Sequence, residues 1–289
     1  MDARRLLLLR AVLRAGSMSA AARSLGMTQP AVSQQLALLE REAGVPLVLR
    51  STAGVRPTEA GAVLLRRAEA VGAELHRAEE EMLAFSRLRR GVVRLAAYPS
   101  AAATVVPRAA AALRAARPEV DLVLVEAEPP EATGLVRTGD ADVAVVFRYD
   151  AADDDGLLTI ALADEPVDLV VPAAEAPDVA PRIDGLGGVT WVAGCERCRA
   201  HLVAVCEAHG FAPRIGHTTD DFVVVQNLVA AGLGWSVLPR GALEAFRHPD
   251  IATVPGLFGR RRTALVHAPG AEAVPAVGAL LEQLVRAAA

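Results

Sequence analysis

Residues 17–42 carry two short helical patterns on either side of a glycine, and this segment limits the possible folds more than any other part of the chain. Ser19 can cap the first helix, and Gly26 suits the left-handed backbone that ends it. Thr28 can cap the second helix, whose first turn accommodates Pro30 because an N–H there has no intrahelical partner to lose. The segment therefore predicts two helices joined by a tight turn.

Each predicted helix has one apolar face. Ala21, Ala22 and Leu25 share a face of the first helix. The apolar residues of the second helix recur at i, i+4 and i+7, and they are Val32, Leu36 and Leu39. A polar group at the start of the second helix then projects elsewhere, and its members are Thr28, Gln29, Pro30, Ser33 and Gln34. A helix-turn-helix presents such residues to base edges, where glutamine can bond adenine and serine can bond bases or phosphates. The spacing alone fits an ordinary helical hairpin with a polar face equally well.

The sequences on both sides favour DNA binding. An apolar run at residues 1–17 supplies a first helix that can pack behind the pair. Residues 45–57 predict a short hairpin, or wing, in which Arg50 and Arg56 could contact phosphates or a minor groove. Thr58 can then cap a long helix that follows the wing.

Charge is distributed unevenly along the 289 residues. Residues 1–58 hold eight arginines against three carboxylates, residues 59–90 are neutral, and the whole chain carries −4, so residues 91–289 carry −9. A basic head on an acidic body indicates that only the head meets a polyanion. Hydrophobic residues make up 53% of the chain, which is enough for the cores of about two soluble domains.

Residues 16–65 resemble the winged helix-turn-helix of the LysR-type transcriptional regulators in the order, spacing and turn residues of their motifs. The stretch reads GSMSAAARSLGMTQPAVSQQLALLEREAGVPLVLRSTAGVRPTEAGAVLL. By this resemblance the polar group faces the major groove of double-stranded DNA, and Arg50 and Arg56 lie in the wing. Gln34 stands where many members of the family carry arginine, so the resemblance leaves the base preference open.

From residue 64 onward the long helix carries a heptad seam of apolar residues. Its positions alternate in steps of four and three, and they are Leu64, Ala68, Val71, Leu75, Ala78, Met82 and Phe85. Such a seam needs burial, either against a second copy of the chain or against the chain itself. In the family that the head resembles, this linker helix pairs two copies, so a homodimer or tetramer is expected.

Strands and helical stretches alternate through the rest of the chain, which predicts βαβ units and a parallel sheet. Strands are expected at 91–100, 120–127, 141–147, 164–172, 188–194, 213–218, 234–239, 251–256 and 263–270, and helices at 102–115, 131–137, 197–209, 221–231 and 274–287. The stretches TGDADVAVV and NLVAAGLGWSVLP resemble the effector-binding domain of the same family, which has the two lobes of a periplasmic binding protein.

The expected organisation is a mainly α-helical winged helix-turn-helix at 1–58, a linker helix at 59–90 and an α/β effector-binding domain at 91–289. Lobe I would hold about 91–162 and 265–289, and lobe II about 163–264. The chain would then cross between the lobes near 161–163 and 262–265.

In open sheets of this kind a ligand binds at the carboxyl ends of the strands. The residues there form the expected effector site, and they are Ser100, Ala101, Phe147, Arg148, Cys195, Thr218 and Thr219. Ser100 and Thr218 would each precede a helix whose free N–H groups attract an anion, and Arg148 could bind a carboxylate with two hydrogen bonds. A carboxylate is therefore the expected effector class. The alternative is that the first two residues are only helix caps and that Arg148 is solvated.

The three cysteines, Cys195, Cys198 and Cys206, lie close together with His201 and His209. A Cys-x-x-Cys spacing suits a redox pair or a metal site, although the cluster lacks the second pair typical of zinc. The alternative is a structural or cleft-lining role. No catalytic motif is found, so the chain is not expected to be an enzyme, and no cofactor or metal is predicted.

These features predict a cytoplasmic DNA-binding transcriptional regulator whose body senses a small molecule. A stretch of about 20 apolar residues, which a membrane-spanning helix needs, is not found in the sequence. The competing interpretation is a two-lobed solute-binding protein whose N-terminal segment does not bind DNA. The basic head, the wing and the heptad seam favour the regulator.

Overall fold

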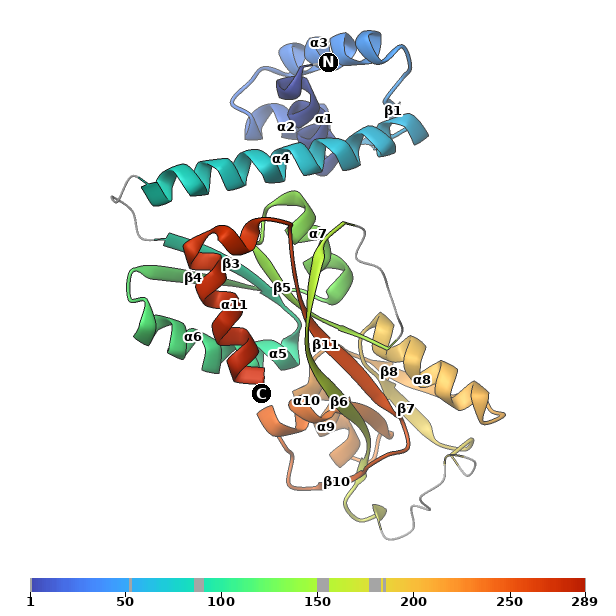
Figure 1. Cartoon of the computed structure of the whole chain (residues 1–289). Helices are drawn as coiled ribbons and strands as arrows, with labels where there is room; N and C mark the ends of the chain where they lie inside the picture. The colour runs from blue at the N-terminus through green and yellow to red at the C-terminus, as the bar shows by residue number, and fades with distance from the viewer. Residues whose placement is uncertain are drawn as a thin grey trace. The chain divides into compact units, whose positions relative to one another are not determined.

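The computed structural model describes residues 2–51, 54–85, 91–149, 156–176, 183 and 186–288, without the side chains of residues 76, 77 and 79–85. The chain divides into two compact units, one made of residues 1–87 with 137–140 and the other of the remainder (Figure 1). We refer to them as the N-terminal unit and the C-terminal unit.

The N-terminal unit is a winged helix-turn-helix followed by a long helix, as predicted. Its elements are α1 (Ala3–Ala15), α2 (Met18–Ser24), α3 (Gln29–Ala43), β1 (Val48–Ser51), β2 (Gly54–Pro57) and α4 (Glu59–Phe85). β1 and β2 pair as an antiparallel hairpin. The apolar face of α3 is fully buried at Val32, Leu36 and Leu39, which share one core with Leu9 and Val12 of α1.

The turn between α2 and α3 follows the sequence signals closely. Gly26 has a φ of +62°, and the Thr28 Oγ1 accepts the N–H of Ala31 at 3.4 Å. Two details of the prediction are wrong. The cap of α2 is Ser17, whose Oγ accepts the N–H of Ala20 at 3.1 Å, whereas Ser19 lies inside the helix. Leu25 is 39% exposed, because α2 ends before it and its side chain leaves the buried face.

The first turn of α4 passes very close to the backbone that enters the wing. Thr58 caps α4 by accepting the N–H of Gly61 at 3.0 Å, as predicted. A Cβ atom at Gly61 would lie only 1.9 Å from the Leu47 carbonyl oxygen. Glycine is therefore required at this position by close contact rather than by backbone conformation.

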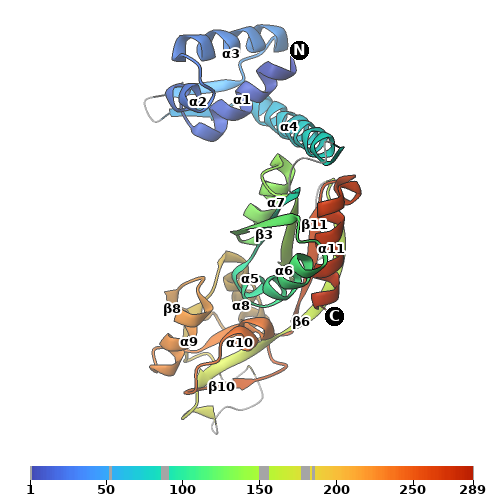
Figure 2. The same cartoon turned by 90° about the vertical axis from the view of Figure 1, so that its left-hand side faces the viewer.

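Lobe I of the C-terminal unit is built on three parallel strands. β3 (Gly91–Ala97) pairs with β4 (Val120–Glu126) and with β5 (Val143–Arg148). The connections are α5 (Pro99–Ala103), α6 (Val105–Ala116) and α7 (Pro129–Thr138). α6 and the C-terminal α11 (Pro275–Ala288) lie side by side on one face of the sheet, and α7 covers the other face (Figures 1 and 2).

Two long strands continue from lobe I into lobe II. The first half of β6 (Leu158–Pro172) pairs with β11 (Arg260–His267), which in turn pairs with β5. The second half of β6 pairs with β9 (Ser236–Pro239) and β10 (Ile251–Val254). The β6–β11 register shifts between Thr263 and Ala264. Both segments that were expected to cross between the lobes, 161–163 and 262–265, therefore lie within this strand pair.

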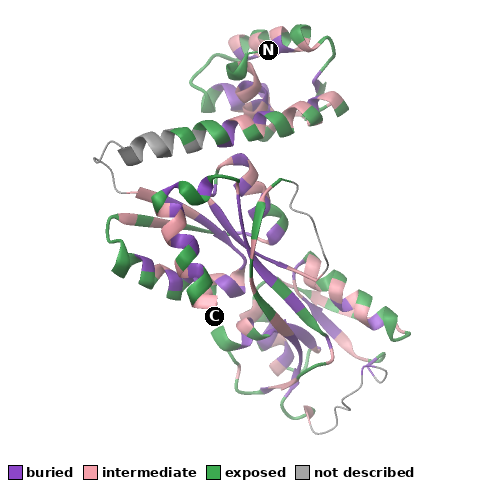
Figure 3. Cartoon of the chain, viewed as in Figure 1, coloured by how far each residue is buried: buried purple, intermediate pink, exposed green. Residues whose placement is uncertain are grey.

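Lobe II adds a second parallel pair, β7 (Thr190–Ala193) with β8 (Arg214–Thr218). Its helices are α8 (Glu196–Ala208), α9 (Phe222–Ala230) and α10 (Arg240–Ala245). The short 3-10 turn η3 (Ala271–Ala273) precedes α11. Burial concentrates on the central strands, and β5 is buried at every position but its last (Figure 3).

Most expected elements are present, but four features differ from the prediction. The expected parallel sheet is mixed, because β11 pairs antiparallel with β5 and β6, and β6 pairs antiparallel with β9 and β10. The expected helix at 102–115 is divided at Thr104 into α5 and α6, and α5 begins earlier, at Pro99. The first half of β6 was missed, although Leu158, Ile160 and Leu162 recur at every second position along it. α10, with six residues, was also missed. No helix in the described part of the chain is long and apolar enough to span a bilayer.

Gly61→Ala is expected to lower the free energy of unfolding by about 1–3 kcal/mol, the usual cost of forcing extra atoms into a packed site. Gly134→Ala in α7 is the matched control, since a Cβ there meets nothing within 4 Å, and alanine should stabilise that helix by about 0.5–1 kcal/mol. Urea unfolding followed by circular dichroism checks both variants. Equal effects of the two substitutions would contradict the close contact at Gly61.

Candidate functional site

The start of α3 presents a polar surface above a fully buried apolar face. Gln29, Pro30 and Gln34 are exposed, and Ser33 is half-buried. Thr28 is exposed and caps the helix. The residues expected to contact DNA therefore lie on one side of α3, opposite the core.

The wing is attached to α3 by side-chain hydrogen bonds. The Arg50 Nη1 donates to the Ser33 Oγ at 3.2 Å, so a wing arginine lies directly beside the polar group. At the other end of α3, the Glu40 carboxylate accepts the N–H groups of Leu47 (2.8 Å) and Val48 (3.2 Å). Arg56 is exposed on β2. Glu40 was not singled out from the sequence, where it reads only as a solvated charge.

The seam of α4 is only partly free to meet a second chain. Ala68 is fully buried and Leu64 packs against the core of the N-terminal unit, so these two positions are already covered within the chain. The expectation of an open seam is wrong for them, because α1 packs along this part of α4. Val71 is half-buried, whereas Leu75 and Ala78 are exposed. The predicted seam positions Met82 and Phe85 lie outside the described side chains.

In the C-terminal unit the carboxyl ends of five strands meet around one cavity of about 50 Å³. The side chains that line it include Ser100 after β3, Glu128 after β4, Phe147 near the end of β5, Cys195 after β7, and Thr219 and Asp220 after β8. Four of the expected effector-site residues therefore lie together at the carboxyl ends of the strands: Ser100, Phe147, Cys195 and Thr219. Ala101 lines a separate cavity of about 240 Å³, together with the other side of Ser100.

The structure contradicts the three arguments that favoured a carboxylate effector. Ser100 lies inside the five-residue α5, which Pro99 begins without an N–H to offer. Thr218 ends β8, and the start of α9 is already capped by the Asp221 carboxylate, which accepts the N–H of Val223 at 2.8 Å. Arg148 pairs with Arg262 in the β5–β11 ladder and does not line the cavity. All three expectations are therefore wrong in their geometry, although the carboxylate class itself stays an untested prediction.

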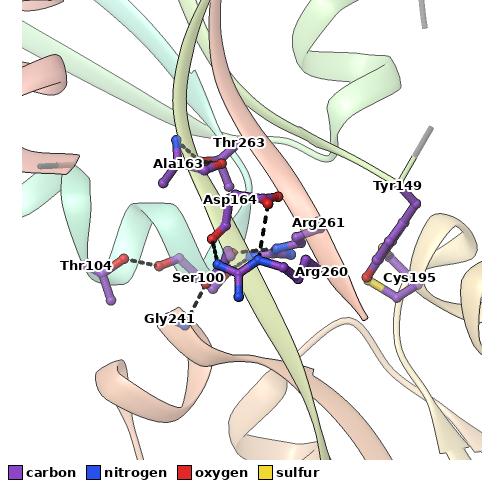
Figure 4. A network of polar contacts seen from close by, with 12 residues as sticks. Ser100, Thr104, Tyr149, Ala163, Asp164, Cys195, Gly241, Arg260, Arg261 and Thr263 are labelled. Atoms are coloured by element: carbon purple, nitrogen blue, oxygen red, sulfur yellow. Dashed lines mark hydrogen bonds and ion pairs between the residues drawn. The ribbon is translucent and has the colours of Figure 1, made fainter. Parts of the chain in front are cut away.

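Arg261 on β11 is the cationic residue of the cavity. It is 2% exposed, its Nε donates to the Glu165 Oε2 at 2.6 Å, and its Nη2 donates to the Ser100 Oγ at 2.9 Å (Figure 4). Its guanidinium also lies 4.8 Å from the ring centroid of Tyr98 and 4.4 Å from that of Phe147. Burial lowers the pKa of Arg261, but Tyr98, Glu165, Tyr149 and Cys198 together raise it above its usual value, so the group stays charged.

A sequence signal for Arg261 existed but was missed. Three arginines, Arg260 to Arg262, begin a strand, and alternation sends the middle one to the opposite face from its neighbours. Arg260 and Arg262 are exposed, and Arg261 is buried. Its partner Glu165 also accepts the N–H of Gly241 at 2.6 Å, so one carboxylate links β6, β11 and α10.

The cysteine pair lies beside the same cavity. The Cys195 and Cys198 sulfur atoms are 3.3 Å apart and form no disulfide, and the Tyr149 hydroxyl donates to the Cys198 Sγ at 3.7 Å. The hydrogen bond from Cys195 lowers the pKa of the Cys198 thiol. Burial raises the pKa of Cys206 to about 11. Among the described residues no group of three histidines, cysteines or carboxylates is arranged to hold a metal ion.

Glu128 has an incomplete hydrogen-bond shell. Its Oε2 is buried without a partner, although the Cys195 thiol bonds the carboxyl group. Burial raises the pKa of Glu128 and so does the neighbouring Asp220, whereas the Cys195 hydrogen bond and the charges of Arg261 and Arg197 lower it. Glu128 was not among the expected site residues, because an isolated glutamate after a strand carries no distinctive pattern.

Two family models match the chain. The model for the bacterial regulatory helix-turn-helix protein of the lysR family matches residues 3–62, and the model for the LysR substrate binding domain matches residues 86–289. The second match alone covers more than half of the chain.

Relatives and solved structures agree with these matches. The HTH-type transcriptional regulator CbbR of Xanthobacter flavus is 34% identical over 145 residues, which are 50% of this chain and 43% of CbbR, so the chain spans about half the length of that relative. The probable cat1 operon transcriptional activator of Acinetobacter lwoffii is 28% identical over 90% of both chains. The crystal structure of CbnR, a LysR family transcriptional regulator, shares the fold with a TM-score of 0.65 and 22% identity over 100% of both chains. The structure of CbnR with its target DNA gives a TM-score of 0.62 at 22% identity, over 99% of this chain and 100% of CbnR.

Glu165→Ala is expected to lower the free energy of unfolding by about 3–5 kcal/mol, because it leaves the Arg261 charge buried without its partner. The control is Asp164→Ala in the neighbouring ion pair with Arg260, whose side chains are 60% and 52% exposed. That change should cost less than about 1 kcal/mol. Urea unfolding measures both, and a cost for Glu165→Ala as small as for Asp164→Ala would show that Arg261 is not stabilised by this pair.

Proposed function

Because the chain belongs to the LysR family of bacterial regulatory proteins, we propose that it is a DNA-binding transcriptional regulator whose C-terminal unit senses a small molecule. The relatives CbbR and the cat1 activator are named as transcriptional regulators, and CbnR has been solved with its target DNA. No catalytic role is proposed, and a regulator of bacterial transcription acts in the cytoplasm.

One observation carries the proposed DNA binding more than the others. The exposed Gln29 and Gln34 stand on α3 next to an arginine of the wing, since Arg50 bonds Ser33 at 3.2 Å. A glutamine can donate and accept at the same adenine, and an arginine beside it can hold the phosphate backbone. α3 then reads bases while the wing fixes its position.

The proposed sensing follows from which elements build the cavity. Ser100 and Glu128 come from lobe I, and Cys195, Thr219 and Asp220 come from lobe II. A ligand that contacts both lobes favours the lobe angle that it fits best, and it can shift that equilibrium only by its difference in affinity for the two states. The competing solute-binding protein would share this cavity but would have no affinity for DNA.

Gln29→Ala and Gln34→Ala are each expected to weaken binding to the preferred DNA site by about 1–3 kcal/mol and to leave binding to random DNA nearly unchanged. Gln35→Ala is the control on the same helix, because the Gln35 Oε1 is held by the Arg5 Nε at 3.1 Å. Fragments selected from random duplexes by the full-length protein supply the site, and fluorescence anisotropy supplies the affinities. Failure of the protein to retain any duplex at low salt would favour the solute-binding protein.

A homodimer through the outer part of α4 is also proposed. Leu75→Asp should split it, since Leu75 is 46% exposed and would bring a buried charge into the helix pair. Val63→Asp is the control, because Val63 is 49% exposed on the same helix but lies off the seam. Light scattering gives the mass of each variant. An unchanged mass for Leu75→Asp would mean that α4 pairs elsewhere or not at all.

A further inference from the structure

Cys195 and Cys198 bring two thiols together at the wall of the cavity of about 50 Å³, which both residues line. Cys195 precedes α8 as its N-cap and Cys198 lies three residues further on, so the two side chains share one side of the helix. Their sulfur atoms are 3.3 Å apart. Gly194 leaves room for the pair, because a Cβ atom there would lie 3.2 Å from the Cys198 Cβ.

Side chains around the pair hold both sulfur atoms in place. The Tyr149 hydroxyl donates to the Cys198 Sγ at 3.7 Å, and the Tyr149 ring stacks on His201 with the ring centroids 3.8 Å apart. Cys195 is 7% exposed and packs against the core of lobe I. Ligand atoms that are fixed before binding lose little freedom on binding, and a hydrogen bond to a ligating atom orients it. The pair is therefore a preformed ligand with two sulfur atoms.

The separation of the sulfur atoms selects the geometry of an atom bound to both. A bond from a thiolate to zinc is about 2.3 Å long. Two bonds of about this length span about 3.3 Å when they meet at a right angle, about 3.8 Å at a tetrahedral angle and about 4.6 Å in a line. The observed 3.3 Å therefore fits a pyramidal centre whose bonds meet at nearly right angles. Trivalent arsenic has this geometry and binds sulfur strongly.

Other thiol chemistry fits the pair less well. Structural zinc takes four ligands, and in the described part of the chain no group of three histidines, cysteines or carboxylates could hold a metal ion. Monovalent copper in linear coordination needs sulfur atoms further apart. A disulfide needs them about 2.05 Å apart, together with an oxidant. Arsenic keeps a hydroxyl as its third ligand, so two thiolates from the protein are enough.

We propose that Cys195 and Cys198 chelate trivalent arsenic and that arsenite is an effector of this protein. The step needs no oxidant or reductant. Arsenous acid forms two As–S bonds and loses two As–O bonds, and each departing hydroxide takes one thiol proton and leaves as water. One water needs roughly 10–15 Å³ of such a cavity, so 50 Å³ admits a molecule as small as arsenous acid.

The position of the pair couples it to both lobes. The cysteines belong to lobe II, whereas Tyr149 follows β5 of lobe I and bonds the Cys198 sulfur. A change at this sulfur therefore alters a contact between the lobes. This inference rests on the proposed sensing role, because it names the ligand class of that same site.

Arsenite titrated into the full-length protein, in a phosphine reductant, tests the site by calorimetry and native mass spectrometry. One arsenic should bind per chain, with a mass gain of As–OH less two hydrogens. Cys195→Ser and Cys198→Ser should each weaken binding about tenfold or more, because only one As–S bond remains. Cys206→Ser is the matched control, since Cys206 is fully buried further along α8 and does not line the cavity.

Fluorescence anisotropy tests the effector role separately. Arsenite should change the affinity of the wild-type protein for its selected DNA site by about fivefold or more, the usual scale of coupling between two sites. The same arsenite should leave the affinity of Cys195→Ser unchanged. If the serine variants do not fold, Tyr149→Phe carries the comparison with Cys206→Ser, and weaker arsenite binding is expected because the sulfur loses its hydrogen bond.

Three results would overturn the inference: equal arsenite affinity in Cys198→Ser and Cys206→Ser, tighter binding of zinc than of arsenite, or a DNA affinity that bound arsenite leaves unchanged. Each of them would leave the regulator standing if the wild-type protein still retains its DNA site. Loss of that retention would remove the proposed regulator whatever arsenite does.

Discussion

The ion pair between Arg261 and Glu165 holds the C-terminal unit together at the place where its two lobes share strands. The guanidinium is buried against the rings of Tyr98 and Phe147, and its Nη2 donates to the Ser100 hydroxyl. Glu165 extends the link to the backbone of Gly241 in α10. A buried charge of this kind is tolerated only with its partner in place. The wall of the cavity therefore depends on residues far apart in sequence.

Local signals made the N-terminal unit the more predictable part of the chain. Thr28, Gly26 and the spacing of Val32, Leu36 and Leu39 each act within one or two helical turns, and the structure confirms all of them. The errors arise where tertiary packing, rather than a local pattern, determines whether a residue is buried. Ala68 fits a heptad seam in sequence, but α1 already covers it.

The cavity could be located from sequence, but its chemistry could not. Strand ends mark Ser100 and Cys195 because parallel strands finish at the same edge of a sheet. Alternation along β11 marks Arg261 as the buried one of three arginines, but the β5–β11 register, which pairs Arg148 with the exposed Arg262, cannot be read from a local pattern. Likewise, α9 begins three residues later than the sequence suggested, with Asp221 rather than Thr218 before it. The Asp221 carboxylate caps the N–H groups that were expected to bind an anion.

Strands β6 and β11 run uninterrupted between the lobes and are paired along their shared length, with one register shift between Thr263 and Ala264. A ribbon of this kind has no swivel point, since every turn of one lobe against the other must twist hydrogen-bonded backbone. The ribbon therefore resists a large rotation of one lobe against the other. The lobe angles between which a ligand selects would then differ by a small rotation rather than by a swing from an open to a shut cleft.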